Sequence, residues 1–142
     1  MNREAMARDI AAEIEDISGA SVRLSDEGIV ISIENIQFAP DSALLMESEK
    51  AKLDRIANIL MRYPDRDILV GGHTALAGTE AGRLQLSLER AGAVAEYLLG
   101  KKVRSPERMV IRGYGAEQPV ASNSTEEGMR KNRRVEITIL EN

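Results

Sequence analysis

Residues 68–99, ILVGGHTALAGTEAGRLQLSLERAGAVAEYLL, carry the pattern that decides the predicted fold. Residues 68–70 form a short, continuous apolar run, as expected for a strand that helices cover on at least one face. From about residue 79 to residue 99, apolar side chains return at helical spacing. These side chains are Leu84, Leu88, Ala91, Val94, Ala95 and Leu98. The stretch therefore predicts a buried strand followed by a long amphipathic helix, with Gly100 as its C-cap.

The segments before this unit predict a helix, a hairpin and a second helix. Residues 3–17 place apolar side chains near helical spacing among charged residues. In the run SVRLSDEGIVISIEN (21–35), apolar and polar residues alternate on both sides of a turn that contains Gly28. This pattern predicts a β-hairpin. Residues 43–62 again have one apolar face, and Pro64 ends that predicted helix because proline disfavours α geometry in the preceding residue.

The segments after it predict two more strands. Residues 109–113 form the first, residues 115–128 form a loop rich in Pro, Ser, Asn and Gly, and residues 135–139 alternate as a last strand. The order is helix, hairpin, helix, strand, helix, strand, strand. Strands that alternate with helices indicate an α/β fold, in which the helices pack on one sheet.

The composition narrows the class of protein. A chain of 142 residues fits one domain. The net charge of -4 and the scarcity of aromatic residues argue against a nucleic-acid partner. No apolar run reaches the length of a membrane span, and the charged N-terminus lacks the apolar centre of a signal peptide. We therefore expect no membrane insertion by this chain and no signal peptide within it.

One polar stripe stands out on the long helix. Arg83, Ser87 and Arg90 are separated by four and three residues, so they share one face of the helix, at the border of its apolar stripe. A guanidinium at such a border suits a carboxylate ligand, because its planar fork can donate two parallel hydrogen bonds. Spacing alone favours the plainer alternative, which is a solvated or salt-bridged helix face.

Signs of catalysis or metal binding are weak. His73 is the sole histidine and the chain has no cysteine, whereas metal sites and catalytic triads need convergent partners. No phosphate-cradling or nucleophile motif is present. We expect no enzyme, no metal and no cofactor, and a structural role for His73. The basic residues 130–134 could contact phosphates, but we expect them to lead into an edge strand and to pair with carboxylates.

Four blocks together resemble the OmpA C-terminal-like family, which includes the peptidoglycan-associated lipoprotein and the flagellar stator protein MotB. The blocks are GGHTALAG (71–78), RLQLSLERAGAVAEYL (83–98), IRGYGAEQPVASNSTEEG (111–128) and NRRVEITI (132–139). The resemblance implies a βαβαβ-type sandwich over residues 36–142, with residues 1–35 as an N-terminal helix and hairpin extension. It also implies a periplasmic, outer-membrane-associated location and an additional domain in the full-length protein.

The resemblance further implies a peptidoglycan site. In the family, an Asp after the Thr of GHT holds the ammonium of a diaminopimelate, and the Arg of LSxxRA holds its carboxylate. Here Ala75 stands at the Asp position, so an ammonium would lack its anionic partner. The missing carboxylate could come from Asp41 or Glu80, the site could take a different stem peptide, or it could be an idle scaffold. The implied site residues are Arg90, Thr74, Ala75, Arg83, Leu86, Asp41 and Ser42.

Two functions follow from these residues. The first is an envelope module that contacts a peptidoglycan stem peptide through Arg90, with an altered diamino-acid preference. The alternative is a structural or protein-interaction module that has lost wall binding, and Ala75 is the feature that favours it.

Overall fold

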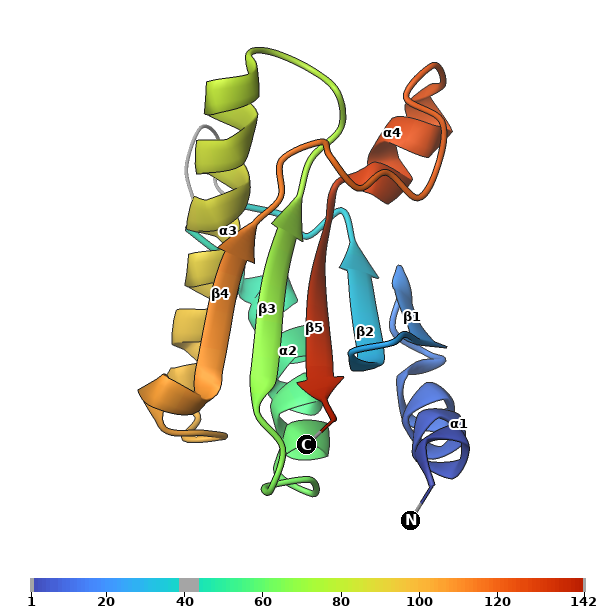
Figure 1. Cartoon of the computed structure of the whole chain (residues 1–142), viewed down its shortest axis with the longest axis vertical. Helices are drawn as coiled ribbons and strands as arrows, with labels where there is room; N and C mark the ends of the chain where they lie inside the picture. The colour runs from blue at the N-terminus through green and yellow to red at the C-terminus, as the bar shows by residue number, and fades with distance from the viewer. Residues whose placement is uncertain (1, 39–43, 142) are drawn as a thin grey trace.

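The computed structural model describes residues 2–38 and 44–141, and within them the chain forms a mixed α/β sandwich (Figure 1). The elements are α1 (Arg3–Ile14), β1 (Ala20–Leu24), β2 (Gly28–Glu34), α2 (Glu47–Leu60), β3 (Ile68–His73), α3 (Glu80–Gly100), η1 (Pro106–Arg108), β4 (Met109–Gly113), α4 (Glu126–Asn132) and β5 (Arg134–Leu140). The predicted class, helices packed on one mixed sheet after an N-terminal helix and hairpin, is confirmed.

The strands form one sheet in the order β1-β2-β5-β3-β4. β3 and β4 are parallel, whereas β5 runs antiparallel to both β2 and β3. The last strand is therefore central, and the expectation that residues 130–134 lead into an edge strand is wrong. Because β2 of the hairpin pairs with β5, the N-terminal segment and the rest of the chain share one sheet. The division of the chain after residue 35 stays a prediction.

The core lies between the sheet and the helices α1, α2 and α3. Alternate residues of β5, namely Val135, Ile137 and Ile139, belong to it together with buried isoleucines of β2 and α1. Ile137 faces Ile31 on one side and Val70 on the other, and all three are fully buried or nearly so. Burying an aliphatic side chain of this size stabilises the fold by roughly 1.5–3 kcal/mol. The core is aliphatic, as the shortage of aromatic residues requires.

Several element boundaries differ from the sequence-based expectations. The second helix begins at Glu47 rather than near residue 43, because Leu45 pairs with Phe38 in an isolated β-bridge. The first helix ends at Ile14. Gly100 is the last residue of α3 and not its cap, since Lys102 takes the left-handed conformation with a φ of 62°.

The segment predicted as a loop over residues 115–128 ends in the short helix α4. Thr125 caps this helix by accepting a hydrogen bond from the backbone N–H of Gly128 at 2.9 Å. A Thr followed by two glutamates is a helix start signal that the loop prediction passed over. The helix returns the chain to the sheet, and residues 132–134 lead into the start of β5.

The glycines of β3 and β4 decide how α3 sits on the sheet. A Cβ on Gly72 would lie 2.0 Å from the carbonyl oxygen of Ser87, and one on Gly113 would lie 2.5 Å from the backbone nitrogen of Leu88. α3 therefore packs directly on the backbone of these strands. This packing buries Ser87 and leaves Leu88 49% exposed. The prediction that Leu88 belongs to the buried apolar stripe of the helix is therefore wrong.

Candidate functional site

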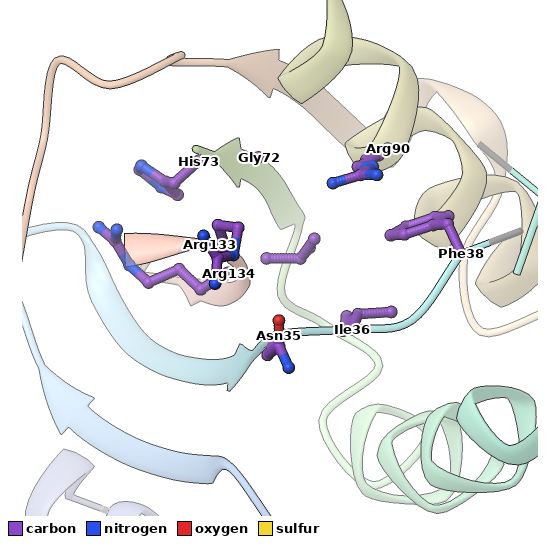
Figure 2. A pocket seen from close by; sticks show the side chains of 9 residues that line it. Asn35, Ile36, Phe38, Gly72, His73, Arg90, Arg133 and Arg134 are labelled. Carbon is purple, nitrogen blue, oxygen red and sulfur yellow. The ribbon is translucent and has the colours of Figure 1, made fainter. Parts of the chain in front are cut away.

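Arg90 projects from α3 into a small pocket beside the end of β3 (Figure 2). Its guanidinium carbon lies 4.7 Å from the centroid of the Phe38 ring. Its Nε is buried and has no hydrogen-bond partner in the described structure. The pocket volume of about 30 Å³ accommodates a small polar group rather than a whole ligand. The lining residues are Asn35, Ile36, Phe38, Gly72, His73, Arg90, Arg133, Arg134 and Val135.

The charges around this pocket are positive. Burial lowers the pKa of Arg90, and the nearby charge of Arg133 lowers it further. Arg90 still carries its proton, because a guanidinium does not lose it in proteins. None of the residues that line the pocket is acidic, within the part of the chain that the structure describes. A half-buried guanidinium with an unused N–H is a donor for an incoming carboxylate or another oxyanion.

The loop after β3 is held rigidly, and it places Ala75 in the interior. The backbone N–H of Thr74 donates to the carbonyl of Gly115 at 2.8 Å. The Thr74 hydroxyl donates to the carbonyl of Ala75 at 2.9 Å. Ala75 is 5% exposed. Neither residue lines the Arg90 pocket.

Arg83, Ser87 and Arg90 do not act as one stripe, contrary to the interpretation of their spacing. The Arg83 guanidinium turns back and donates to the carbonyl of Gly78 at 2.7 Å. Ser87 is buried, donates to the carbonyl of Leu84 and accepts from the N–H of Gly115, each at 2.9 Å. Its hydroxyl therefore ties α3 to the loop after β4. Of the three, only Arg90 reaches the pocket beside β3.

Other predicted site residues lie elsewhere or outside the description. Arg83 and Glu80 line a separate pocket of about 200 Å³ together with Leu76. Glu80 does not line the Arg90 pocket. Leu86 is half-buried on α3 and does not line that pocket either. Asp41 and Ser42 fall outside the described residues.

Asn132 is fully buried and binds backbone groups. Its side-chain oxygen accepts from the N–H groups of Val120 and Ala121 at 2.8 and 3.0 Å. Its amide nitrogen donates to Ala121 and Asn123. These bonds hold the loop before α4.

Arg134 joins a charge cluster on the sheet face away from α2 and α3. Its Nε donates to Glu136 at 2.7 Å, and Arg23 holds the same carboxylate with two bonds of 3.0 and 3.1 Å. Burial alone would raise the pKa of Glu136, but His73, Arg23 and Arg134 together hold it well below its usual range. The ring of His73 stacks on Tyr114 and points away from Arg90 (Figure 2).

Of the residues that line the pocket, sequence reasoning had assigned only Arg90 to the site, and the omissions that matter most for its chemistry are Phe38 and Arg133. Phe38 is the only phenylalanine in the chain, which is a signal that could have marked it. Arg133 was grouped with its neighbours as a support for the fold, yet its side chain lines the pocket with Arg90. Arg134 lines the pocket as well, but its guanidinium is held by Glu136, whereas Arg133 pairs with the exposed Glu126.

The family follows from comparison with known proteins. Residues 37–133 match the model of the OmpA family. The chain belongs to the OmpA family. The resemblance seen in the sequence blocks is thereby confirmed for this OmpA-family chain, and the matched residues include Phe38, Arg90 and Arg133.

Relatives of this OmpA-family chain include named envelope proteins. The peptidoglycan-binding protein ArfA of Mycobacterium tuberculosis is 38% identical over 104 residues, which cover 73% of this chain and 32% of ArfA. The probable lipoprotein YiaD of Escherichia coli is 37% identical over 123 residues, which cover 86% of this chain and 56% of YiaD. The chain thus spans a third to just over half of these relatives.

A solved structure matches almost the whole chain. The cell wall anchor of the T6SS from Pseudomonas aeruginosa is 32% identical with a TM-score of 0.80, and the match covers 99% of this chain and 100% of that chain. The N-terminal helix and hairpin are therefore included in this match. Within the described residues, no helix has the length and apolar character to cross a membrane. No group of His, Asp and Glu there could hold a metal ion.

Proposed function

We propose that this OmpA-family chain is a non-enzymatic, periplasmic module that contacts peptidoglycan non-covalently through Arg90. The observation that carries the proposal is the buried, unpartnered Nε of Arg90 above the Phe38 ring. Withholding a hydrogen bond from a desolvated charge is costly, and a ligand oxyanion would remove that cost. The similarity to the peptidoglycan-binding protein ArfA and to the cell wall anchor from Pseudomonas aeruginosa supports the choice of ligand.

The ligand preference is proposed to differ from that of a diamino-acid site. The Asp that would take the ammonium is replaced by Ala75, which is buried and apolar. None of the described residues that line the Arg90 pocket is an acid. The carboxylate half of the site is therefore kept and the ammonium half is lost.

Co-sedimentation with purified peptidoglycan sacculi tests the proposal. We expect the wild-type protein to sediment with sacculi and Arg90→Ala to stay in solution, with both proteins folded by circular dichroism. Arg83→Ala is the matched control, because it removes an arginine of the same helix whose guanidinium bonds to Gly78 outside the pocket. Equal sedimentation of the wild type and Arg90→Ala would refute the role of Arg90.

The second candidate function is a structural or protein-interaction module without wall binding. Ala75 favours it, since loss of the ammonium partner is what a degenerating site would show first. A wild-type protein that leaves sacculi unbound, with its fold intact, would favour this candidate over the first.

A further inference from the structure

Arg133 provides a second guanidinium at the Arg90 pocket, and this guanidinium is not held in a buried ion pair. Arg133, which follows α4, lines the same pocket as Arg90. Its acidic neighbour is Glu126 at 3.3 Å, whose side chain is 82% exposed. A pair so exposed to water is weak, so the positive charge of Arg133 stays available to a ligand.

The third guanidinium of the pocket is different. Arg134 is 4% exposed and donates to the Glu136 carboxylate at 2.7 Å. It also donates to the carbonyl of Gln118 at 2.8 Å. Its charge is already balanced, so the pocket offers two available cations, Arg90 and Arg133. No acid stands against them among the lining residues that the structure describes.

We propose that Arg133 is a specificity-determining residue and that the pocket takes an oxyanion end group with no ammonium beside it, such as the terminal carboxylate of a peptide. An α-amino acid places its ammonium next to the carboxylate that Arg90 would hold. That ammonium would be repelled by the charge of Arg133 and would find no anionic partner among the described residues that line the pocket. The terminal carboxylate of an acylated residue carries a neutral amide at that position and escapes the repulsion. The inference rests on the proposed function, because it names the ligand chemistry of the same site.

The Arg90 side chain supports this choice geometrically. Its guanidinium is fixed over Phe38, and its unpartnered Nε can complete a two-bond contact with a carboxylate. The small volume of the pocket admits the end group itself and leaves the rest of the ligand on the surface. Charge near the end group, and not the length of the ligand, then decides which ligand binds.

Titrations followed by amide NMR shifts of Gly72 and Asn35 test the inference. The two probes are N-acetyl-D-alanyl-D-alanine, which has a carboxylate and no ammonium, and free diaminopimelate, in which each carboxylate has an ammonium on the same carbon. At equal ionic strength we expect the acetylated dipeptide to bind wild type at least about fivefold more tightly, as expected for one added like-charge contact near a protein surface. Arg133→Gln should remove this preference.

Lys131→Gln is the matched control for this test. It also removes one cation from α4, but Lys131 pairs with Glu127 at 3.7 Å and does not line the pocket. The control should keep the preference. The inference is overturned if diaminopimelate binds as tightly as the dipeptide, if neither probe shifts these amides, or if Lys131→Gln acts like Arg133→Gln. Sacculus binding by the wild type is scored separately, so a failed proposed function and a failed charge preference give different results.

Discussion

Arg90, which is half-buried, and Arg134, which is buried, both line the pocket beside β3, and their surroundings are opposite. Arg134 bonds to Glu136 and to two backbone carbonyls, so its charge is balanced within the chain. Arg90 has an aromatic ring beside it, a second cation nearby and a buried N–H without a partner. The contrast teaches that a buried charge with its own counterion serves the fold. A buried N–H of a charged group that has no hydrogen-bond partner, as at Arg90, is expected to serve a ligand.

The largest effect is expected from removing the counterion of the balanced cluster. Glu136→Ala should lower the free energy of unfolding by about 3–5 kcal/mol, because the buried Arg134 guanidinium would keep its backbone hydrogen bonds but lose its counterion. Urea unfolding measures the loss. Glu126→Ala is the control, since its exposed pairing with Arg133 is worth under about 1 kcal/mol. Equal losses in the two variants would erase the distinction between the clusters.

Arg134→Ala should destabilise the protein less, by roughly 1–3 kcal/mol, the range for losing a hydrogen-bonded charge partner. Arg23 still holds the Glu136 carboxylate in this variant, which limits the loss. Urea unfolding of Arg134→Ala measures this loss. An unchanged midpoint accompanied by lost sacculus binding would move Arg134 from the fold to the ligand site.

The role of the missing acid can be tested at Ala75, which stands where the family resemblance places the ammonium-binding Asp but does not itself line the Arg90 pocket. Wild-type protein should bind free diaminopimelate weakly or undetectably, and Ala75→Asp should strengthen binding by about ten- to a hundredfold, the effect of one charged hydrogen bond of roughly 1.5–3 kcal/mol. Calorimetry on both proteins measures this. Arg83→Asn, alone or added to Ala75→Asp, should change little, because Arg83 bonds to Gly78 and does not line the pocket. Tight binding by the unmodified protein would show that Ala75 does not disable the site.

The smallest effect is a pH dependence of stability that arises from His73 and Glu136. Burial lowers the pKa of His73 below its ordinary 6.5, so the unfolded chain takes up a proton first as the pH falls. The free energy of unfolding should therefore decline below about pH 6.5. Glu136, whose folded pKa is depressed, adds a second decline below about pH 4.5. Melting temperatures of the wild type and His73→Gln should differ in slope between pH 6.5 and 5; identical slopes would contradict the assignment.

Local periodicity predicted the strands and the three longer helices of this fold, but neither the short helix α4 nor the arrangement of the elements. Alternation marked the hairpin and β5, yet the central place of β5 depends on pairing with β2 and β3, which are distant in the sequence. The rotation of α3 that buries Ser87 depends on the close approach of Gly72 and Gly113. Helical spacing alone predicted that Leu88 is buried, whereas Leu88 is exposed and its neighbour Ser87 is buried.

The candidate site was predictable only in part, for a related reason. Arg90 could be singled out from the LSxxRA block, and the structure places it in a pocket. The residues around Arg90 could not be deduced from the sequence. Arg133 and Arg134 are adjacent in the chain, yet Arg133 pairs with the exposed Glu126 and Arg134 with Glu136. Arg83 was predicted to lie on the same face of the helix as Arg90. Its guanidinium instead donates a hydrogen bond to the backbone carbonyl of Gly78.

The most direct test compares the free energy of unfolding of the wild type and Arg90→Ala, each with and without soluble peptidoglycan fragments. Without fragments, we predict equal stability within about 1 kcal/mol, because the buried Nε of Arg90 has no hydrogen-bond partner in the part of the chain that the structure describes, so none would be lost there. With fragments, the wild type should gain stability in proportion to the logarithm of their concentration, and Arg90→Ala should gain none. A large loss of stability in Arg90→Ala without fragments, or an equal gain in both proteins with them, would contradict a ligand-binding role for Arg90.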